Sequence, residues 1–316
     1  MNLISWQSQP VEQVYGLRVQ SVFAMAGRSV PEAPDLVLRL GSSRPCPPPA
    51  SGPGMEIGRL EAGGRTMTSV VAITGGGWSI RFHDLAEAIV GAEVRDVVLH
   101  PDPAAPPGML EVLAAGPVLA HVLALKGITC LHASAVATPG AAATAFVGTS
   151  GAGKSTLAGL CCCLGAELVA DDILRLEMTH GAPICVPGGR ELRLRPGAAK
   201  VGAALAGMAR RTTADGRTAV LAGPVTLDPV FLGAVIVPVL GADSTRVRRL
   251  RGAEATKAIL AATRVGMLRL GSATTAALDL AGQVSTTVPV WEVHLSRVAQ
   301  GPDLLPRELI ELVGLG

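Results

Sequence analysis

The chain has 316 residues, and its 27 lysines and arginines against 25 aspartates and glutamates give a formal net charge of +2. This balance creates no global field toward nucleic acid or an anionic membrane, and aromatic residues at 3% leave little for base stacking. Its apolar runs are too short and too broken by Gly and Pro to span a bilayer, and the first residues lack the pattern of a secretory signal. We therefore expect a cytoplasmic protein of one or two domains whose partners include neither nucleic acid nor membrane.

Short strand-like runs separated by Gly, Pro and Ser clusters fill the first hundred positions. The candidate strands are residues 13–22, 35–40, 66–73 and 78–82. A Pro-rich connector follows at 101–108. We therefore expect a small sheet-rich domain over residues 1–108.

From residue 109 the pattern changes to alternating helices and strands. An Ala/Leu-rich helix candidate at 109–126 leads into the second domain, residues 109–316. Strand patterns follow at 128–137, 143–147, 167–170, 173–178, 184–186, 232–238, 245–250 and 290–295, and helix patterns at 155–164, 196–209 and 253–263. This order predicts an α/β domain that contains a βαβ unit over residues 143–170.

The most specific motif follows the strand candidate 143–147. It reads Gly148-Thr149-Ser150-Gly151-Ala152-Gly153-Lys154-Ser155, with Thr156 next. Such glycines let backbone N–H groups surround phosphates, Lys154 supplies a point charge, and the Ser155 hydroxyl is a ligand for Mg²⁺. At average glycine usage the pattern arises by chance in a chain of this length on the order of once in a hundred. It predicts binding of a nucleoside triphosphate.

Two acids, Asp171 and Asp172, directly follow the next strand candidate, 167–170. An acid at the carboxyl end of a strand beside such a loop is where Mg²⁺ needs its second anchor. A pair allows one carboxylate to hold the metal while the other accepts the proton of an attacking hydroxyl or water. The alternative interpretation is a solvated strand end.

Three further residues are candidates for the same chemistry. If the strand that carries His132 neighbours the acids, its imidazole can reach Asp171 or a phosphate; otherwise it is a core residue of an apolar strand. Arg193 and Arg195 share one face of an extended stretch, which suits either a migrating phosphoryl group or a solvated edge strand.

Residues 131–136, 148–156 and 168–172 together resemble the catalytic domain of HPr serine kinase/phosphorylase, a relative of the ATP-dependent phosphoenolpyruvate carboxykinases. The resemblance implies an α/β catalytic domain with a P-loop, ATP as donor and a homo-oligomer. It also implies that His132 and Asp171 handle the proton, that Lys154 binds the phosphates, and that Ser155 and Asp172 hold Mg²⁺.

A second likeness lies outside these segments. Residues 15–19, 34–41 and 289–295 look like the HPr-kinase-related proteins associated with ribosomally made, modified peptides, including lasso peptide kinases. This likeness implies a peptide acceptor.

Together these features predict a Mg·ATP-dependent kinase that phosphorylates a serine or threonine hydroxyl of a peptide or small protein, with Arg193 or Arg195 on the transferring group. One alternative is a small-molecule kinase acting on a compound such as free serine. Another is a nucleotide-gated scaffold that hydrolyses ATP slowly. The short interval between Lys154 and Asp171 favours a kinase, because an ordinary ATPase usually places its acid further along the chain.

Overall fold

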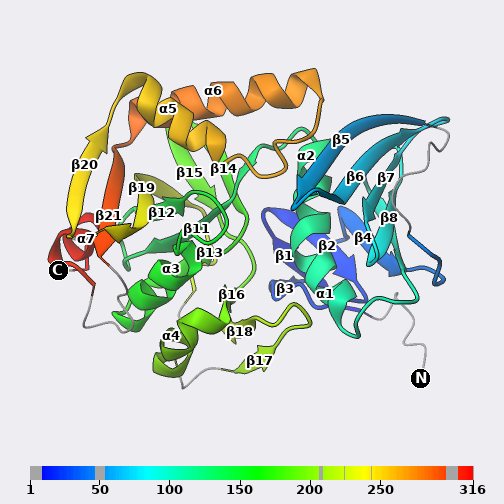
Figure 1. The fold of residues 1–316 in the computed structure, drawn as a ribbon, viewed down its shortest axis with the longest axis horizontal. Coiled ribbons are helices and arrows are strands. Elements are labelled where there is room, and N and C mark those ends of the chain that lie inside the picture. The colour runs from blue at the N-terminus through cyan, green and yellow to red at the C-terminus, as the bar shows by residue number, and fades with distance from the viewer. Residues whose placement is uncertain are drawn as a thin grey trace. The chain divides into compact units, whose positions relative to one another are not determined.

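The computed structural model describes residues 9–46, 54–205, 209–223, 225–242, 244–296 and 305–315. It is a mixed α/β structure that divides into two compact units (Figure 1). Unit 1 comprises Met1–Ile128 and Val265–Thr274, and unit 2 comprises Thr129–Arg264 and Thr275–Gly316. The first boundary between these units lies after Ile128.

Unit 1 contains a mixed sheet of nine strands in the order β3-β1-β2-β4-β9-β8-β7-β6-β5. The strands are β1 (Val11–Val14), β2 (Leu17–Ser21), β3 (Arg28–Val30), β4 (Leu36–Leu40), β5 (Gly54–Ala62), β6 (Arg65–Ile73), β7 (Trp78–Phe82), β8 (Ala86–Val90) and β9 (Asp96–Pro101). Strand β4 pairs in parallel with β2 and β9, while the other pairs are antiparallel. In β2, Leu17, Val19 and Ser21 are buried at alternate positions, as expected for a strand with one face on a core.

The helical segment before residue 128 belongs to unit 1. The sequence predicts one helix over 109–126, but the chain forms α1 (Met109–Leu113), a π-helical turn (Ala114–Val118) and α2 (Leu119–Leu125). Pro117 lies inside the turn and has no N–H to donate, which explains the interruption. His121 of α2 meets the ring of Phe82 edge to face, with the ring centroids 5.8 Å apart. This packing joins the segment to the sheet of unit 1.

Unit 2 is built on a sheet in the order β10-β14-β15-β19-β12-β11-β13, with β21 and then β20 added beside β19. Its strands are β10 (Cys130–Leu131), β11 (Ala133–Ala137), β12 (Ala143–Val147), β13 (Glu167–Ala170), β14 (Leu174–Thr179), β15 (Ala182–Val186), β19 (Val230–Ala242), β20 (Arg246–Leu250) and β21 (Val290–Ser296). The expected βαβ unit is β12, helix α3 (Lys154–Cys163) and β13. However, β11 lies between the two strands and is antiparallel to both. The loop after β12 and the acids after β13 are therefore separated by one strand.

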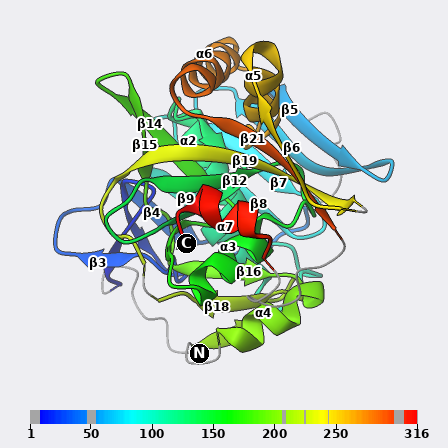
Figure 2. The same cartoon turned by 90° about the vertical axis from the view of Figure 1, so that its left-hand side faces the viewer.

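Helices cover both faces of this sheet (Figure 2). Helices α5 (Gly252–Ala261) and α6 (Gly271–Thr287) pack on one face through residues such as Ile259 and Val284. Helices α3, α4 (Ala199–Ala204) and α7 (Arg307–Val313) pack on the other, around Phe146 and Leu168. Two apolar cores thus hold the sheet rigid where the loop and the acids leave it.

A small antiparallel sheet, in the order β16-β18-β17, completes unit 2. It consists of β16 (Glu191–Leu194), β17 (Arg210–Thr212) and β18 (Thr218–Leu221). The helix expected over 196–209 is a 3₁₀ turn (Pro196–Ala198) followed by α4, and residues 206–208 of that prediction lie outside the described residues. Within the described ranges, none of the helices combines the length and apolar character needed to cross a bilayer.

Candidate functional site

The glycine-rich loop connects β12 to α3. Its glycines Gly148, Gly151 and Gly153 have φ angles of 144°, 91° and 87°, which glycine adopts at little cost. Lys154 begins α3, and its Nζ donates hydrogen bonds to the carbonyl oxygens of Gly148 and Thr149, each at 2.9 Å. Burial lowers the pKa of Lys154 to about 8. The loop therefore curls around a buried amine, as a phosphate-binding loop requires.

Asp171 follows β13 and is only 6% exposed. Its Oδ1 accepts hydrogen bonds from Ser134 Oγ at 2.6 Å and Ser155 Oγ at 2.8 Å, and its Oδ2 accepts one from the backbone N–H of Arg193 at 2.8 Å. Burial raises the pKa of Asp171 even though these hydrogen bonds act in the opposite direction. All three donors are neutral, so they solvate the carboxylate without balancing its charge.

Asp172 points to a different set of partners. Its backbone has a φ of 68°, a left-handed conformation that strains a residue with a side chain. Its Oδ2 accepts a hydrogen bond from Arg264 Nη2 at 3.0 Å, and its Oδ1 lies 3.6 Å from His132 Nε2. Burial opposes ionisation of Asp172, but attraction by Arg264 and His132 prevails and lowers its pKa.

His132 thus pairs with Asp172, whereas the resemblance paired it with Asp171. The reason is local. The strand expected over 128–137 is interrupted at His132, between β10 and β11, and the turn at Asp172 sends the two carboxylates to different places. Arg264 Nη1 also donates a hydrogen bond to His132 Nδ1 at 3.1 Å. Burial lowers the pKa of His132 to about 4, so the ring is neutral at physiological pH.

Three arginines approach the loop. Arg195 Nη2 donates a hydrogen bond to Ser150 Oγ at 2.8 Å. Arg193 Nη2 and Arg217 Nε contact the same carboxylate oxygen of Asp215, at 2.8 and 3.2 Å. Asp215 lies in the turn between β17 and β18, so the small sheet holds these two arginines in place.

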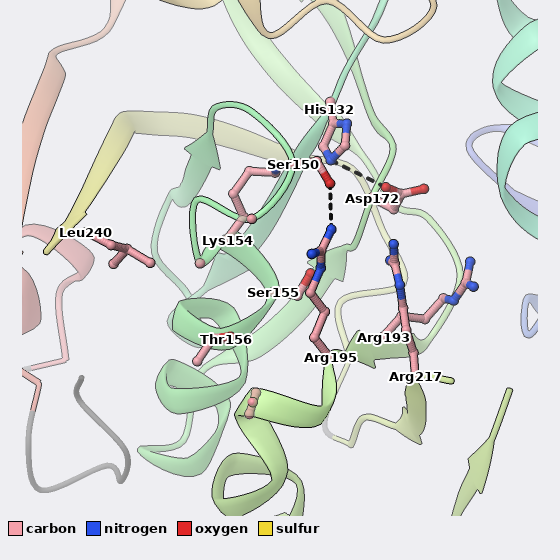
Figure 3. Close-up of a pocket in the computed structure, with 14 residues that line it drawn as sticks. His132, Ser150, Lys154, Ser155, Thr156, Asp172, Arg193, Arg195, Arg217 and Leu240 are labelled. Carbon is pink, nitrogen blue, oxygen red and sulfur yellow. Dashed lines mark hydrogen bonds and ion pairs between the residues drawn. The ribbon is translucent and has the colours of Figure 1, made fainter. Parts of the chain in front are cut away.

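These groups surround one cavity of about 270 Å³ in unit 2, shown in Figure 3. It is lined by His132, Ser150, Gly151, Gly153, Lys154, Ser155, Thr156, Asp172, Arg193, Arg195, Gly197, Ala198, Arg217 and Leu240. Arg195 and Asp172 lie on one side of the loop in Figure 3, and Leu240 lies on the other. Of the residues singled out from the sequence, Gly148, Thr149, Ala152 and Asp171 are not part of this lining.

The oxygen atoms of Ser155 and Asp171 suit Mg²⁺, which prefers hard oxygen ligands. Among the described residues, no three His, Cys, Asp or Glu side chains cluster to form a complete metal cage. Mg²⁺ bound with a nucleotide commonly takes only one or two protein ligands, and phosphates and waters supply the rest. A buried carboxylate beside the loop serine fits this arrangement.

Ser134, Asp215, Arg217 and Arg264 were not singled out from the sequence. Ser134 had a local signal, because it is two residues from His132 on a strand pattern and strand residues two apart share a face. Arg264 had none, because it lies 92 residues from Asp172 in the chain. Two backbone hydrogen bonds fix its segment. Arg264 N–H donates to Cys130 O at 2.7 Å, and His132 N–H donates to Ala262 O at 2.6 Å.

No family model matches the chain, and no curated protein matches it. Solved structures similar to it include the Hpr(Ser) kinase/phosphatase from Coxiella burnetii, with 11% sequence identity over 58% of this chain and 93% of that chain, and a TM-score of 0.28. Likeness at this level carries no argument about this chain.

Proposed function

We propose that this protein is a Mg·ATP-dependent kinase that transfers the γ-phosphoryl group of ATP to a serine or threonine hydroxyl of a peptide or small protein. One observation carries the proposal. A single cavity is lined by the glycine-rich loop, three arginines and an ionised carboxylate, Asp172. Phosphoryl transfer needs a phosphate cradle, cations around the migrating group and a proton acceptor, and this cavity offers all three.

The loop and the arginines serve the donor in this proposal. Backbone N–H groups of residues 148–155 surround the phosphates, and Lys154 turns from the carbonyls of its own loop to the phosphate oxygens. Arg193, Arg195 and Arg217 place charge around the transferring group, where a planar guanidinium binds two oxygens at once. Mg²⁺ would neutralise phosphate charge when it is bound by Ser155 and Asp171.

The geometry favours exchanging the roles that the resemblance gave to the two acids. Asp171 lies against the loop serine and accepts a hydrogen bond from its hydroxyl, which orients the Ser155 oxygen for a metal ion. Asp172 lines the cavity, and its lowered pKa keeps it ionised there, so it is available to accept a proton. In the transfer step, the acceptor oxygen bonds to the γ-phosphorus and its proton passes to Asp172. The bond from the γ-phosphorus to the bridging oxygen breaks, and ADP leaves with the electron pair.

A lasso-type or other ribosomally made peptide precursor is the acceptor that we propose. The sequence likeness of residues 15–19, 34–41 and 289–295 to kinases of that kind supports it. A carboxylate that accepts a proton from serine can also activate water or a small alcohol. The acceptor therefore has to be identified by experiment.

The test follows the label of γ-labelled ATP. The protein is incubated with Mg²⁺, labelled ATP and, in separate reactions, a library of serine- and threonine-containing peptides, free serine, or no acceptor. We expect label on a peptide hydroxyl and none with Lys154→Met, which removes the loop cation. Label on free serine alone would identify a small-molecule kinase, and label only in inorganic phosphate would identify an ATPase. Either of these results would overturn the peptide-kinase proposal.

A further inference from the structure

Arg264 contacts both His132 and Asp172. Its Nη1 is 3.1 Å from His132 Nδ1, and its Nη2 is 3.0 Å from Asp172 Oδ2. Arg264 itself is not among the described residues that line the cavity. Its hydrogen bonds within the site are therefore to the two residues that it holds, His132 and Asp172.

The contact with Nδ1 fixes where the imidazole carries its proton. A guanidinium has five N–H donors, no acceptor, and stays protonated in proteins. Nδ1 of His132 must therefore accept, so it carries no proton, and the single proton of a neutral ring is on Nε2. A doubly protonated ring would set N–H against N–H at 3.1 Å. The Nε2–H bond faces Asp172 Oδ1, 3.6 Å away.

The charges around His132 agree with this assignment. Burial is the main cause that lowers its pKa, and the cations of Arg264, Lys154 and Arg217 add to it. Asp172 is the opposing charge. A neutral ring with its lone pair already used by Arg264 has no free acceptor for a substrate proton.

We propose that Arg264 is a positioning residue that holds His132 as the neutral Nε2–H tautomer, so that His132 donates toward Asp172 and Asp172 alone receives the acceptor's proton. This inference rests on the proposed function for the identity of that proton, while the tautomer itself does not depend on it. It removes His132 from the proton-handling pair that the sequence resemblance formed from His132 and Asp171.

The direct test is ¹⁵N NMR of the imidazole nitrogens in the full chain, with His132→Gln used to assign the His132 signals. We expect the wild type at neutral pH to carry its proton on Nε2. In Arg264→Gln we expect the tautomers to mix, because the guanidinium donor that requires Nδ1 to accept is lost. A wild-type ring protonated on Nδ1 or on both nitrogens overturns the proposal, and so does an unchanged tautomer in Arg264→Gln.

Kinetics separate positioning from a merely structural role. For Arg264→Gln we expect kcat to fall about tenfold to hundredfold while the KM for ATP stays within about threefold, because Arg264 supports the groups that act rather than the phosphates. Arg264→Lys keeps the cation and a donor, so it should restore much of kcat and of the Nε2–H population. The matched control is Arg249→Gln, which removes an arginine stacked 5.7 Å from the ring of Trp291 and outside the cavity lining.

The outcomes are distinguishable from failure of the kinase proposal. If no acceptor is ever phosphorylated but the wild-type ring is Nε2–H and changes in Arg264→Gln, the proposed function fails and the positioning role stands. If phosphoryl transfer occurs and Arg264→Gln lowers KM and kcat no differently from Arg249→Gln, the positioning role fails. The wild-type spectrum decides the tautomer even if Arg264→Gln does not fold.

Discussion

Two buried carboxylates, one in each unit, show how much the kind of donor matters. Glu87 in unit 1 accepts hydrogen bonds from Ser79 at 2.5 Å and Arg81 at 2.9 Å and forms an ion pair with Arg44 at 2.6 Å. Asp171 in unit 2 also has three donors, but they are two hydroxyls and one amide. Burial acts to raise the pKa of both carboxylates. The hydrogen bonds and arginines of Glu87 overcome burial and lower its pKa, whereas the pKa of Asp171 remains raised.

The difference separates a structural carboxylate from one that is prepared for a ligand. The charge of Glu87 is already balanced by two guanidinium groups of the same unit. The charge of Asp171 is solvated but not balanced, and a divalent cation beside Ser155 would supply what is missing. A buried ionisable group therefore indicates function when its partners are neutral, more than when it is part of a closed ion-pair network.

The largest effect is expected at the third carboxylate, Asp172, which lines the cavity. Asp172→Asn should lower the rate of phosphoryl transfer by about a thousandfold, within the range of general-base catalysis, because an amide cannot take the acceptor's proton. ATP affinity, measured by titration calorimetry, should change little. Asp279→Asn, at an exposed position of α6, is the matched control. Transfer at the wild-type rate by Asp172→Asn would show that Asp172 is not the base.

The comparison between Glu87 and Asp171 can be tested with two isosteric changes. Glu87→Gln leaves two arginines without their anion and should lower the free energy of unfolding by about 2 kcal/mol with transfer kinetics unchanged. Asp171→Asn removes an unbalanced buried charge, so stability should stay within about 1 kcal/mol of wild type. The Mg²⁺ concentration for half-maximal activity should rise at least about tenfold. If both variants change stability and Mg²⁺ dependence equally, Glu87 and Asp171 do not differ as a structural and a metal-binding carboxylate.

Nucleotide affinity should depend on pH through Lys154. Its pKa is about 8 in the folded protein against 10.5 for an ordinary lysine, and bound phosphates favour the charged form. ATP binding should therefore weaken as pH rises above about 8, by up to about tenfold per pH unit. The stability of the nucleotide-free protein should depend on pH in the opposite direction. The unfolded chain binds more protons between the two pKa values, so stability rises from pH 8 toward 10.5.

Calorimetric titration with ATP and thermal unfolding across this pH range measure the two trends. Lys154→Arg keeps its charge throughout, so both slopes attributed to this residue should disappear. A wild-type affinity that is flat through pH 8 and 9 would show that the buried amine does not govern phosphate binding.

The smallest effect is expected at Asp215. Its carboxylate forms ion pairs with two arginines, as the carboxylate of Glu87 does in unit 1. Asp215→Asn loosens Arg193 and Arg217 while keeping a polar side chain. The KM for ATP should rise about threefold to tenfold, and kcat should fall by a similar factor, because the cations remain but are less well positioned. Steady-state kinetics check this, and Asp228→Asn serves as a control.

Local pattern was enough to predict the parts of the site that are contiguous in the chain. The loop, the helix that follows it and the acids after the next strand depend on glycine conformations and on strand and helix periods, which short segments encode. The partner of His132 and the presence of Arg264 in the site depend on contacts between distant segments. Local sequence patterns do not reveal such contacts. The sequence did not predict the interruption of the strand at His132. Before it β10 pairs with β14, after it β11 pairs with β12, and an apolar run does not show such a change of partner.

The same limit applies to the fold. The Ala/Leu-rich segment 109–126 was expected to form one helix, yet Pro117 lies in a π-helical turn that divides it into two short helices. Helix α6 was not predicted, because it begins in a Gly, Ser and Thr-rich stretch of weak helix propensity that hides the helical spacing of Ala277, Leu280, Ala281 and Val284. Its burial against the sheet, through residues such as Val284, stabilises it instead.

Strand β11 has a consequence for how this protein tolerates insertions and deletions. Ser134 lies between alanines at 133 and 135, so a slip of one residue in the pairing of β11 would place a methyl group where Asp171 now receives a hydroxyl. The same slip would exchange the faces of Val136 and its neighbouring alanines, which pack in different apolar cores. A single-residue deletion there would thus disturb the hydrogen bond to Asp171 and the packing of the sheet together.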